Sequence, residues 1–253
     1  MLIDTHCHLF SEYYDDIDKI LESAKKNDVG VVIVNGTNYK DNFEVLKLIH
    51  QYDMVYGALG IQPEEVDKNW EDCLSFIENH INDPKIIAIG EIGLDFHYEC
   101  DKKLQKEVFR RQLELAEKFD IPVIIHSRDC IQETYDILKQ YRVRGIMHCY
   151  SGSLEMAYQF IKLGFYLGIG GICTFKNAFK AVKVIENVPL EYIVLETDSP
   201  FLSPVPYRGH VNEPANIKII LEKICELKKL DYQVASSVIY ENVLRLFDND
   251  FNL

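Results

Sequence analysis

Short hydrophobic runs alternate with longer amphipathic stretches along the whole chain. The short runs are apolar at consecutive positions and rich in β-branched residues, which is typical of strands buried on both faces of a parallel sheet. The predicted strands are Leu2–Thr5, Val31–Asn35, Val55–Leu59, Ile86–Ile89, Val123–His126, Gly145–His148, Phe165–Ile169 and Ile193–Glu196.

The stretches between these runs carry hydrophobic residues at helical spacing. The predicted helices are Ile17–Lys26, Asn42–Tyr52, Lys103–Phe119, Leu154–Leu163, Phe179–Asn187, Ala215–Leu227 and Tyr232–Phe247. Eight strand–helix units in 253 residues are typical of a (β/α)8 TIM barrel. A doubly wound open sheet is the alternative, but such sheets usually place a glycine-rich phosphate turn after the first strand. Here His6-Cys7-His8 follows instead, so we predict a single α/β barrel domain over residues 1–253.

Composition and charge narrow the class of protein. Hydrophobic residues make up 47% and charged residues 26%, as in ordinary globular chains. Lys and Arg number 27 against 40 Asp and Glu, and the net charge of −13 excludes a generally basic coat for nucleic acid. The seven cysteines are scattered without a CxxC pair, which favours a reducing compartment. With no signal-peptide pattern and no apolar run near the ~20 residues of a membrane span, we expect a soluble cytoplasmic protein.

Histidine and carboxylate side chains stand at the carboxyl ends of five predicted strands. In a barrel these ends meet at one mouth, where active sites lie. His6 and His8 are two residues apart, so an extended strand points both to one side. Each residue alone has an ordinary structural explanation, but five such ends at one mouth favour a site. The candidates are His6, His8, Glu91, His126, His148 and Asp198.

This set of side chains indicates metal-ion chemistry. Nitrogen and oxygen ligands without thiolate suit Zn²⁺ or Mn²⁺, whereas Mg²⁺ and Ca²⁺ favour oxygen. Four histidines and two carboxylates exceed the needs of one open catalytic site and suffice for two ions that share a carboxylate. Such a pair activates water at neutral pH and stabilises both the attacking and the leaving oxygen. We therefore predict two divalent ions per chain, either Mg²⁺, Mn²⁺ or Zn²⁺.

The candidates stand in motifs that resemble the TatD family of metal-dependent deoxyribonucleases, within the amidohydrolase-like barrels. The motifs are collinear and span nearly the whole chain. They are Leu2-Ile-Asp-Thr-His-Cys-His-Leu9, Gly90-Glu-Ile-Gly-Leu-Asp95, Ile121-Pro-Val-Ile-Ile-His-Ser-Arg128, His148-Cys-Tyr-Ser-Gly-Ser153, Gly171-Ile-Cys-Thr-Phe-Lys-Asn177, Leu195-Glu-Thr-Asp-Ser-Pro200 and Asn212-Glu-Pro214. The resemblance implies a two-metal hydrolase of phosphodiesters, often a 3′→5′ exonuclease on DNA.

The resemblance also implies a role for each residue. By this resemblance, one ion is expected to be bound by His6, His8 and Asp198. The other ion is expected to be bound by His126 and His148, with Glu91 as the bridge. We expect Asp198 or Glu196 to be the general base for the attacking water, which makes Glu91, Asp198 and Glu196 the predicted catalytic residues.

The substrate end of the predicted site is less distinctive. The family usually has histidine where this chain has Gln62, which keeps a hydrogen bond but cannot carry charge. Phosphate oxygens need cations or N–H donors, and Arg128, Lys176 and Arg208 follow strands at the mouth. Three aromatic residues of the same loops are candidates for stacking on a base, namely Tyr150, Phe175 and Tyr207.

The acidic balance favours a small footprint on the substrate. We expect DNA strand ends or short oligonucleotides rather than long duplex DNA, and neither a membrane nor an obligate protein partner. An amide, lactone or aminoacyl-ester hydrolase on the same centre is the alternative, since fold does not fix the reaction. A non-catalytic metal-binding scaffold is a third hypothesis. Cys7 and Cys149 adjoin predicted ligands, and strand alternation predicts that both point away from the ions.

Overall fold

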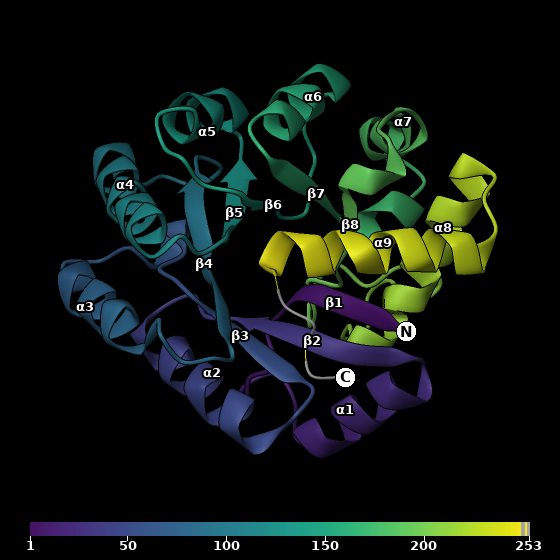
Figure 1. Cartoon of the computed structure of the whole chain (residues 1–253), viewed down its shortest axis with the longest axis horizontal. Coiled ribbons are helices and arrows are strands. Elements are labelled where there is room, and N and C mark those ends of the chain that lie inside the picture. The colour runs from purple at the N-terminus through teal and green to yellow at the C-terminus, as the bar shows by residue number, and fades with distance from the viewer. Residues whose placement is uncertain (249–250, 252–253) are drawn as a thin grey trace.

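The computed structural model describes residues 1–248 and 251, and in this part of the chain eight parallel strands form one sheet. Each strand pairs with the next in chain order, and helices surround the strands (Figure 1). The strands are β1 (Leu2–Cys7), β2 (Val29–Asn35), β3 (Val55–Leu59), β4 (Ile86–Asp95), β5 (Val123–Arg128), β6 (Gly145–Met147), β7 (Phe165–Ile169) and β8 (Ile193–Leu195). The predicted (β/α)8 barrel is confirmed.

Helices alternate with the strands, and two of them follow the last strand. The helices are α1 (Ile17–Lys26), α2 (Tyr39–Gln51), α3 (Trp70–His80), α4 (Lys102–Phe119), α5 (Ile131–Leu138), α6 (Leu154–Lys162), α7 (Phe179–Asn187), α8 (Ile217–Lys228) and α9 (Tyr232–Phe247), with 3-10 turns η1 (Pro63–Glu65), η2 (Gly171–Thr174), η3 (Leu190–Tyr192) and η4 (Pro214–Asn216). Side-chain oxygens accept hydrogen bonds from backbone N–H groups at several helix starts and so fix where those helices begin. These caps are Asp16, Asn38, Asp101, Ser153 and Asp231.

The structure differs from the predicted elements in a few places. Helices α3 and α5 complete the predicted strand–helix units, although no residue ranges were predicted for them. Strand β4 runs on through Gly90 to Asp95, where the prediction stopped at the glycine, and β5 runs on to Arg128. Glu91 therefore lies within a strand that is held by pairing with β5, which extends along the same stretch.

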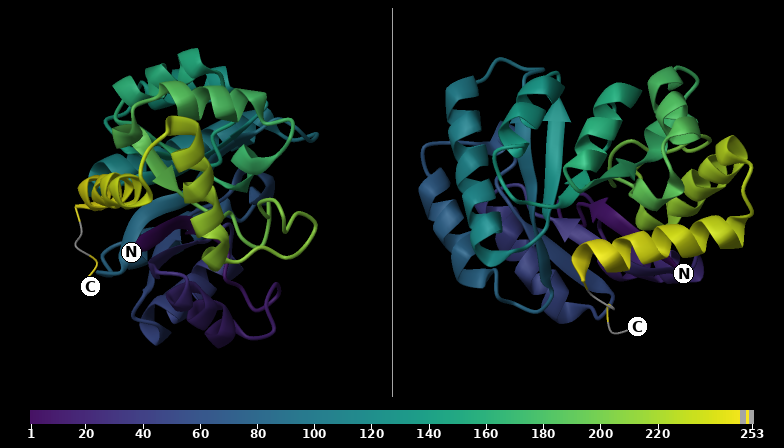
Figure 2. Two further views of the ribbon diagram at one scale, coloured as in Figure 1. Left: turned by 90° about the vertical axis from the view of Figure 1, so that its right-hand side faces the viewer. Right: turned by 45° about the horizontal axis from the view of Figure 1, so that its top comes forward.

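Two hydrophobic cores stabilise the barrel, one outside the strands and one inside them. One lies between the strands and the surrounding helices. The other fills the barrel interior with side chains such as Ile33, Ile124 and Val194, and it continues into the end of α9. Figure 2 shows α9 lying across the barrel next to β1, and α9 has further contacts with β8 and η3. The amino-terminal end of the barrel is thus closed by α9, and the carboxyl ends of the strands stay free for a site.

Hydrogen bonds close the barrel between β1 and the segment after β8. Backbone N–H groups of Asp198 and His8 donate to the carbonyls of His6 and Ser199, at 2.9 and 2.7 Å. The buried Asp4 carboxyl accepts from Thr197 Oγ1 at 2.5 Å and from Thr197 N at 2.9 Å. Burial raises the pKa of Asp4 to about 8. The strand that carries His6 and His8 is therefore tied directly to the turn that carries Asp198.

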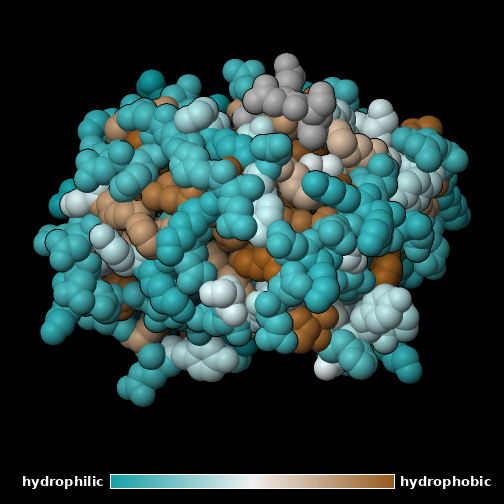
Figure 3. Space-filling model, turned by 90° about the horizontal axis from the view of Figure 1, so that it is seen from below, coloured by the Kyte–Doolittle hydropathy of each residue, from teal (hydrophilic) through white to brown (hydrophobic). Residues whose placement is uncertain are grey.

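The outer surface is that of a globular domain. Figure 3 shows the side on which α1 and α2 lie, where hydrophilic side chains cover most of the face and hydrophobic ones show in the gaps. Among the described residues, no helix combines the length and the apolar character needed to cross a bilayer.

Asn242 on α9 supports the closed end of the barrel, and we predict that Asn242→Ala destabilises the protein. Its amide donates to the carbonyls of Leu190 and Ile193, both at 2.8 Å, and the side chain is fully buried. The variant leaves these carbonyls without their donor, at a cost of about 1–3 kcal/mol of unfolding free energy. Urea unfolding measures this loss.

Exposed Glu241 on the same helix supplies the control. Glu241→Ala should change the unfolding free energy by less than about 0.5 kcal/mol. Metal content should stay unchanged in both variants, because the candidate site lies at the other end of the strands. An Asn242→Ala protein as stable as the Glu241→Ala protein would contradict the structural role of Asn242.

Candidate metal centre

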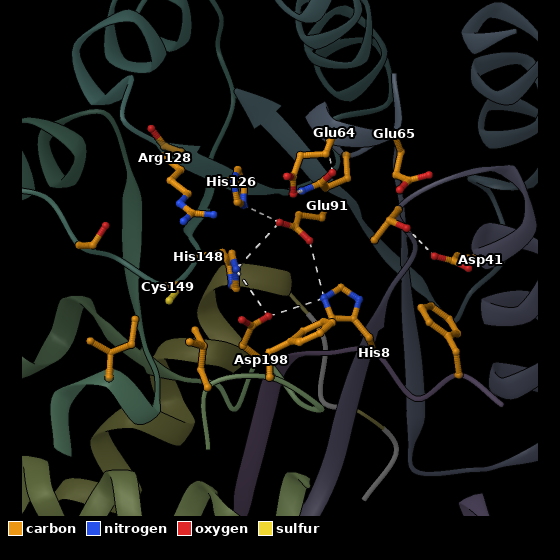
Figure 4. Close-up of a pocket in the computed structure, with 18 of the residues that line it drawn as sticks. His8, Asp41, Glu64, Glu65, Glu91, His126, Arg128, His148, Cys149 and Asp198 are labelled. Carbon is orange, nitrogen blue, oxygen red and sulfur yellow. Dashed lines mark hydrogen bonds and ion pairs between the residues drawn. The ribbon is translucent and has the colours of Figure 1, made fainter. Parts of the chain in front are cut away.

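A cavity of about 650 Å³ opens at the carboxyl ends of the strands. Figure 4 shows histidine and carboxylate side chains converging on its floor. The predicted ligands that line it are His8, Glu91, His126, His148 and Asp198. His6 lies beneath them with no exposed surface. The structure therefore brings all six predicted ligands together, although they come from five different strands or strand ends.

Glu91 lies between two pairs of histidines. Its Oε2 is 3.5 Å from His6 Nε2 and 3.7 Å from His8 Nε2. Its Oε1 is 2.8 Å from His126 Nδ1 and 3.9 Å from His148 Nε2. The two oxygens thus face different pairs, which is the arrangement a bridging carboxylate needs.

Asp198 faces the same centre from the turn after β8. Its Oδ1 lies 3.6 Å from Nε2 of His6 and of His8, and 3.8 Å from His148 Nε2. The Nε2 atoms of His6 and His8 are 3.1 Å apart. Ligands about 2.1 Å from one tetrahedral ion lie roughly 3.4 Å from each other, so this spacing suits metal binding. Three groups of atoms each fit within 4.8 Å, namely His6 with His8 and Asp198, His6 with Glu91 and His148, and His148 with Cys149 and Asp198.

The protonation of the cluster follows from these contacts. Burial opposes charge on Glu91 and Asp198, but the neighbouring histidines outweigh it and hold the pKa of Glu91 well below, and of Asp198 below, the ordinary value. Burial likewise opposes charge on His126, yet Asp95 and Glu91 raise its pKa to about 9. Glu196 and Asp198 raise the pKa of His148 to about 10 against the same burial. At neutral pH and without metal, the cluster is therefore a network of charged pairs.

Backbone geometry brings β4 and β5 close enough for this network. Gly93 has a φ of 145°, and a Cβ there would lie 2.0 Å from the carbonyl oxygen of His126. Only glycine allows both the conformation and the close approach. The GEIGLD motif thus holds Glu91 opposite the strand end that carries His126.

Two further carboxylates stand behind the predicted ligands. Asp95 Oδ2 lies 2.8 Å from His126 Nε2, on the side of the ring away from Glu91. Glu196 Oε1 lies 3.2 Å from His148 Nδ1 and has no exposed surface. Glu196 was predicted beside the site, whereas Asp95 was not predicted. The available signal was its spacing, because Asp95 follows Glu91 by four residues and an uninterrupted strand turns both to one face.

The predicted substrate residues are distributed unevenly. Arg128 and Gln62 line the cavity, with the Arg128 guanidinium 5.4 Å from the centre of the Tyr98 ring. Lys176 is exposed and is not among the residues that line the cavity. Arg208 is also outside it and lies over the ring of Phe175, at 4.3 Å.

Three smaller expectations concern aromatic and cysteine residues. Tyr150 is buried and donates its hydroxyl to the Ser153 carbonyl, so it is not free to stack on a base. Cys7 is buried in the outer hydrophobic core, as strand alternation predicts. Cys149 lines the cavity, which corrects the prediction that it points away. The chain leaves strand geometry there, because β6 ends at Met147 and Cys149 has a φ of 44°.

The raised pKa values predict that metal binding releases protons. Histidine binds metal only when the ligating nitrogen has lost its proton. At pH 7 the pKa values of about 9 for His126 and about 10 for His148 keep both rings charged, so loading the metal-free protein should release at least the protons of these two rings. The number should fall as the pH rises through 9 to 10, because the rings then lose their protons before metal arrives.

Calorimetric titration with Zn²⁺ in two buffers of different ionisation enthalpy measures this release. His97, which is half exposed and paired with Asp129 outside the cluster, provides a control. His97→Gln should release the same number of protons as the unmodified chain. A binding heat independent of the buffer at pH 7 would show that the cluster is already deprotonated.

Comparisons with known proteins agree with this geometry. The model of the family described as TatD related DNase matches residues 3–248. YabD of Bacillus subtilis, named an uncharacterized metal-dependent hydrolase, is 41% identical over 98% of this chain and 99% of its own. A Methanocaldococcus jannaschii protein with the same description is 36% identical over 97% of this chain and 96% of its own. The crystal structure of YJJV, a TatD homologue from Escherichia coli K12, superposes with a TM-score of 0.92 at 33% identity and covers 98% of both chains. The chain therefore belongs to the TatD family.

Proposed function

We propose that this protein is a metal-dependent hydrolase of phosphodiester bonds, acting as a 3′→5′ exodeoxyribonuclease on strand ends or short oligonucleotides. The observation that carries the proposal is the position of Glu91 between two histidine pairs, with Arg128 in the same cavity. Membership in a family described as DNase-related, and metal-dependent hydrolases among the relatives, support it.

The donor atoms suit two divalent ions, either Mg²⁺, Mn²⁺ or Zn²⁺. In the proposal His6, His8 and Asp198 hold one ion, His126 and His148 hold the other, and Glu91 bridges them. Such ions supply a water of lowered pKa and stabilise charge on the attacking and leaving oxygens. The convergence of six donors from five strands or strand ends supports this assignment. The lowered pKa of both carboxyl groups keeps them in the ligating form.

The chain's own groups divide the remaining tasks. Asp198 reaches the cavity and is the carboxylate we assign to accept the proton of the attacking water. Glu196 is fully buried behind His148 and does not line the cavity, so we assign it an effect through His148 instead. Arg128 provides the cation for a phosphate oxygen, and Gln62 offers an uncharged amide nearby.

The rim of the cavity supports a substrate with a small footprint. Asp41, Glu64 and Glu65 stand on the side away from Arg128 (Figure 4). These carboxylates repel a polyanion that continues across the rim. On the same cavity Tyr13 and Phe201 are partly exposed, with ring centres 5.6 Å apart, and offer aromatic faces to a terminal base.

The acidic rim also favours the second candidate function. An amide, lactone or aminoacyl-ester hydrolase needs the same bridging carboxylate and strand-eight aspartate, but it needs no path for a polyanion. Arg128 favours the phosphodiester, since a neutral lactone has no negatively charged group to pair with it.

The seven cysteines are free thiols, which supports the expected cytoplasmic location.

Metal-dependent release from labelled DNA tests the proposed activity. Single-stranded oligonucleotides labelled at the 3′ or the 5′ end are incubated with Mg²⁺, Mn²⁺, Zn²⁺ or EDTA. We expect nucleotides to leave from the 3′ end only when metal is present, and Asp198→Ala to abolish release. No release with any metal, from protein that carries two ions, would contradict the nuclease and favour the acyl hydrolase, which ester and lactone substrates then test.

Arg128→Ala separates substrate binding from metal binding. We expect metal content to stay unchanged and kcat/KM on the oligonucleotide to fall roughly 10–100-fold, which corresponds to the ~1.5–3 kcal/mol of a hydrogen bond to a charged group. Lys176→Ala, an equal loss of charge outside the cavity, is the control and should change kcat/KM by less than about twofold. Equal losses in the two variants would show a general charge effect rather than a phosphate contact.

A further inference from the structure

Each histidine of the centre has one ring nitrogen that faces the other ligands and one that faces away. The nitrogens that face away meet different groups in the two pairs. His8 Nδ1 lies 3.0 Å from the backbone carbonyl of Asn35, and buried His6 Nδ1 has no hydrogen-bond partner in the described part of the chain. His126 and His148 are each backed by a carboxylate, from Asp95 and Glu196.

Asp95 is fixed where it contacts His126. Its side chain is 2% exposed, and its Oδ2 lies 2.8 Å from His126 Nε2. Its Oδ1 accepts from the backbone N–H of His97 at 2.8 Å, and its own N–H donates to Gln105 at 3.1 Å. A carboxylate in this position accepts the proton of Nε2 and leaves the lone pair of Nδ1 for the centre.

Glu196 faces the opposite nitrogen of His148, where the contact is a close ion pair without hydrogen-bond geometry. Its Oε1 lies 3.2 Å from His148 Nδ1 and accepts from the N–H of Cys149 at 2.5 Å. Its Oε2 is buried without a partner. A Cβ at position 168 would lie 2.2 Å from that oxygen, so Gly168 leaves the space that Glu196 occupies. The fold therefore accommodates a buried carboxylate that lines no part of the cavity. Its contact with His148 offsets the desolvation free energy of burying this charge.

We propose that Asp95 and Glu196 are positioning residues, which present His126 by Nδ1 and His148 by Nε2 and make the ion held by this pair the more tightly bound of two. A carboxylate behind an imidazole increases the electron density on the ligating nitrogen and fixes the ring. The backbone carbonyl behind His8 increases the electron density on its ligating nitrogen less, because a carbonyl carries no net charge. The inference depends on the two-ion centre of the proposed function and goes beyond it by ranking the two ions.

Metal titration of the full chain tests the ranking without any activity assay. Chelator-treated protein is titrated with Mn²⁺, and both dissociation constants are measured for the unmodified chain, Asp95→Asn and Glu196→Gln. We expect two unequal constants in the unmodified chain. Each variant should weaken the tighter one by about 10–100-fold and leave the weaker one within about threefold.

Asp41→Asn is the matched control. Asp41 is a buried carboxylate that lines the same cavity, but its hydrogen bonds go to Thr37 and Asn38. The variant makes the same chemical change and should leave the tighter constant unaltered, because Asp41 does not contact His126 or His148. Equal weakening of both constants by Asp95→Asn and Glu196→Gln, or no weakening, would overturn the inference while two ions still bind. Binding of a single ion to the unmodified chain would contradict the two-ion proposal itself.

The ring nitrogens give a second measurement that needs no variant. Nitrogen-15 NMR of the unmodified, Zn²⁺-loaded chain distinguishes metal-bound from protonated imidazole nitrogens. We expect metal at Nδ1 and a proton at Nε2 of His126, and the reverse for His148. A metal-bound Nε2 on His126, or a metal-bound Nδ1 on His148, would overturn the positioning roles even where a variant fails to fold.

Discussion

The closure of the barrel between β1 and the turn after β8 is the interaction on which the centre depends. It brings residue 6 next to residue 198, and the bonds across this seam are backbone hydrogen bonds between His6 and Asp198 and between His8 and Ser199. The ligands on both sides are thus placed by main-chain geometry rather than by flexible side chains. Asp4 strengthens the seam through Thr197, and α9 closes the opposite end, so a rigid frame holds the candidate ligands in place.

The frame holds ionised side chains in a largely buried position. Four imidazoles and two carboxylates converge, and the mutual attraction of His126, His148, Glu91 and Asp198 outweighs the burial that opposes their ionisation. In the metal-free chain, protons therefore occupy the ring nitrogens of His126 and His148 that we propose as metal ligands. Within the cluster, positive and negative charges balance. The excess of acidic residues shows instead along one rim of the cavity, at Asp41, Glu64 and Glu65.

Much of this was predictable from the sequence because strand ends of a barrel must meet. The length and hydrophobic pattern of the short runs predicted the strands. The polar residues at their carboxyl ends predicted which six side chains meet at the mouth, and their role as ligands stays a prediction. The prediction was wrong for Cys149, since a left-handed residue after β6 breaks the alternation on which the expectation relied. Asp95 was missed because Gly90 suggested a strand end, whereas pairing with β5 extends β4 past it. Lys176 and Arg208 follow strands as Arg128 does, but only three-dimensional packing decides which of them reaches the cavity.

Five carboxyl groups within this small volume differ through their surroundings. Asp4 accepts three neutral donors in a fully buried position, and burial raises its pKa to about 8, which suits a structural group. Glu91 and Asp198 face histidines in the cavity and stay ionised, which suits ligands. Asp95 and Glu196 face histidines from behind, and neither lines the cavity. Residue type alone does not separate these roles. Asp4 meets only neutral donors, and for the other four the role follows from the side of the imidazole on which the carboxylate stands.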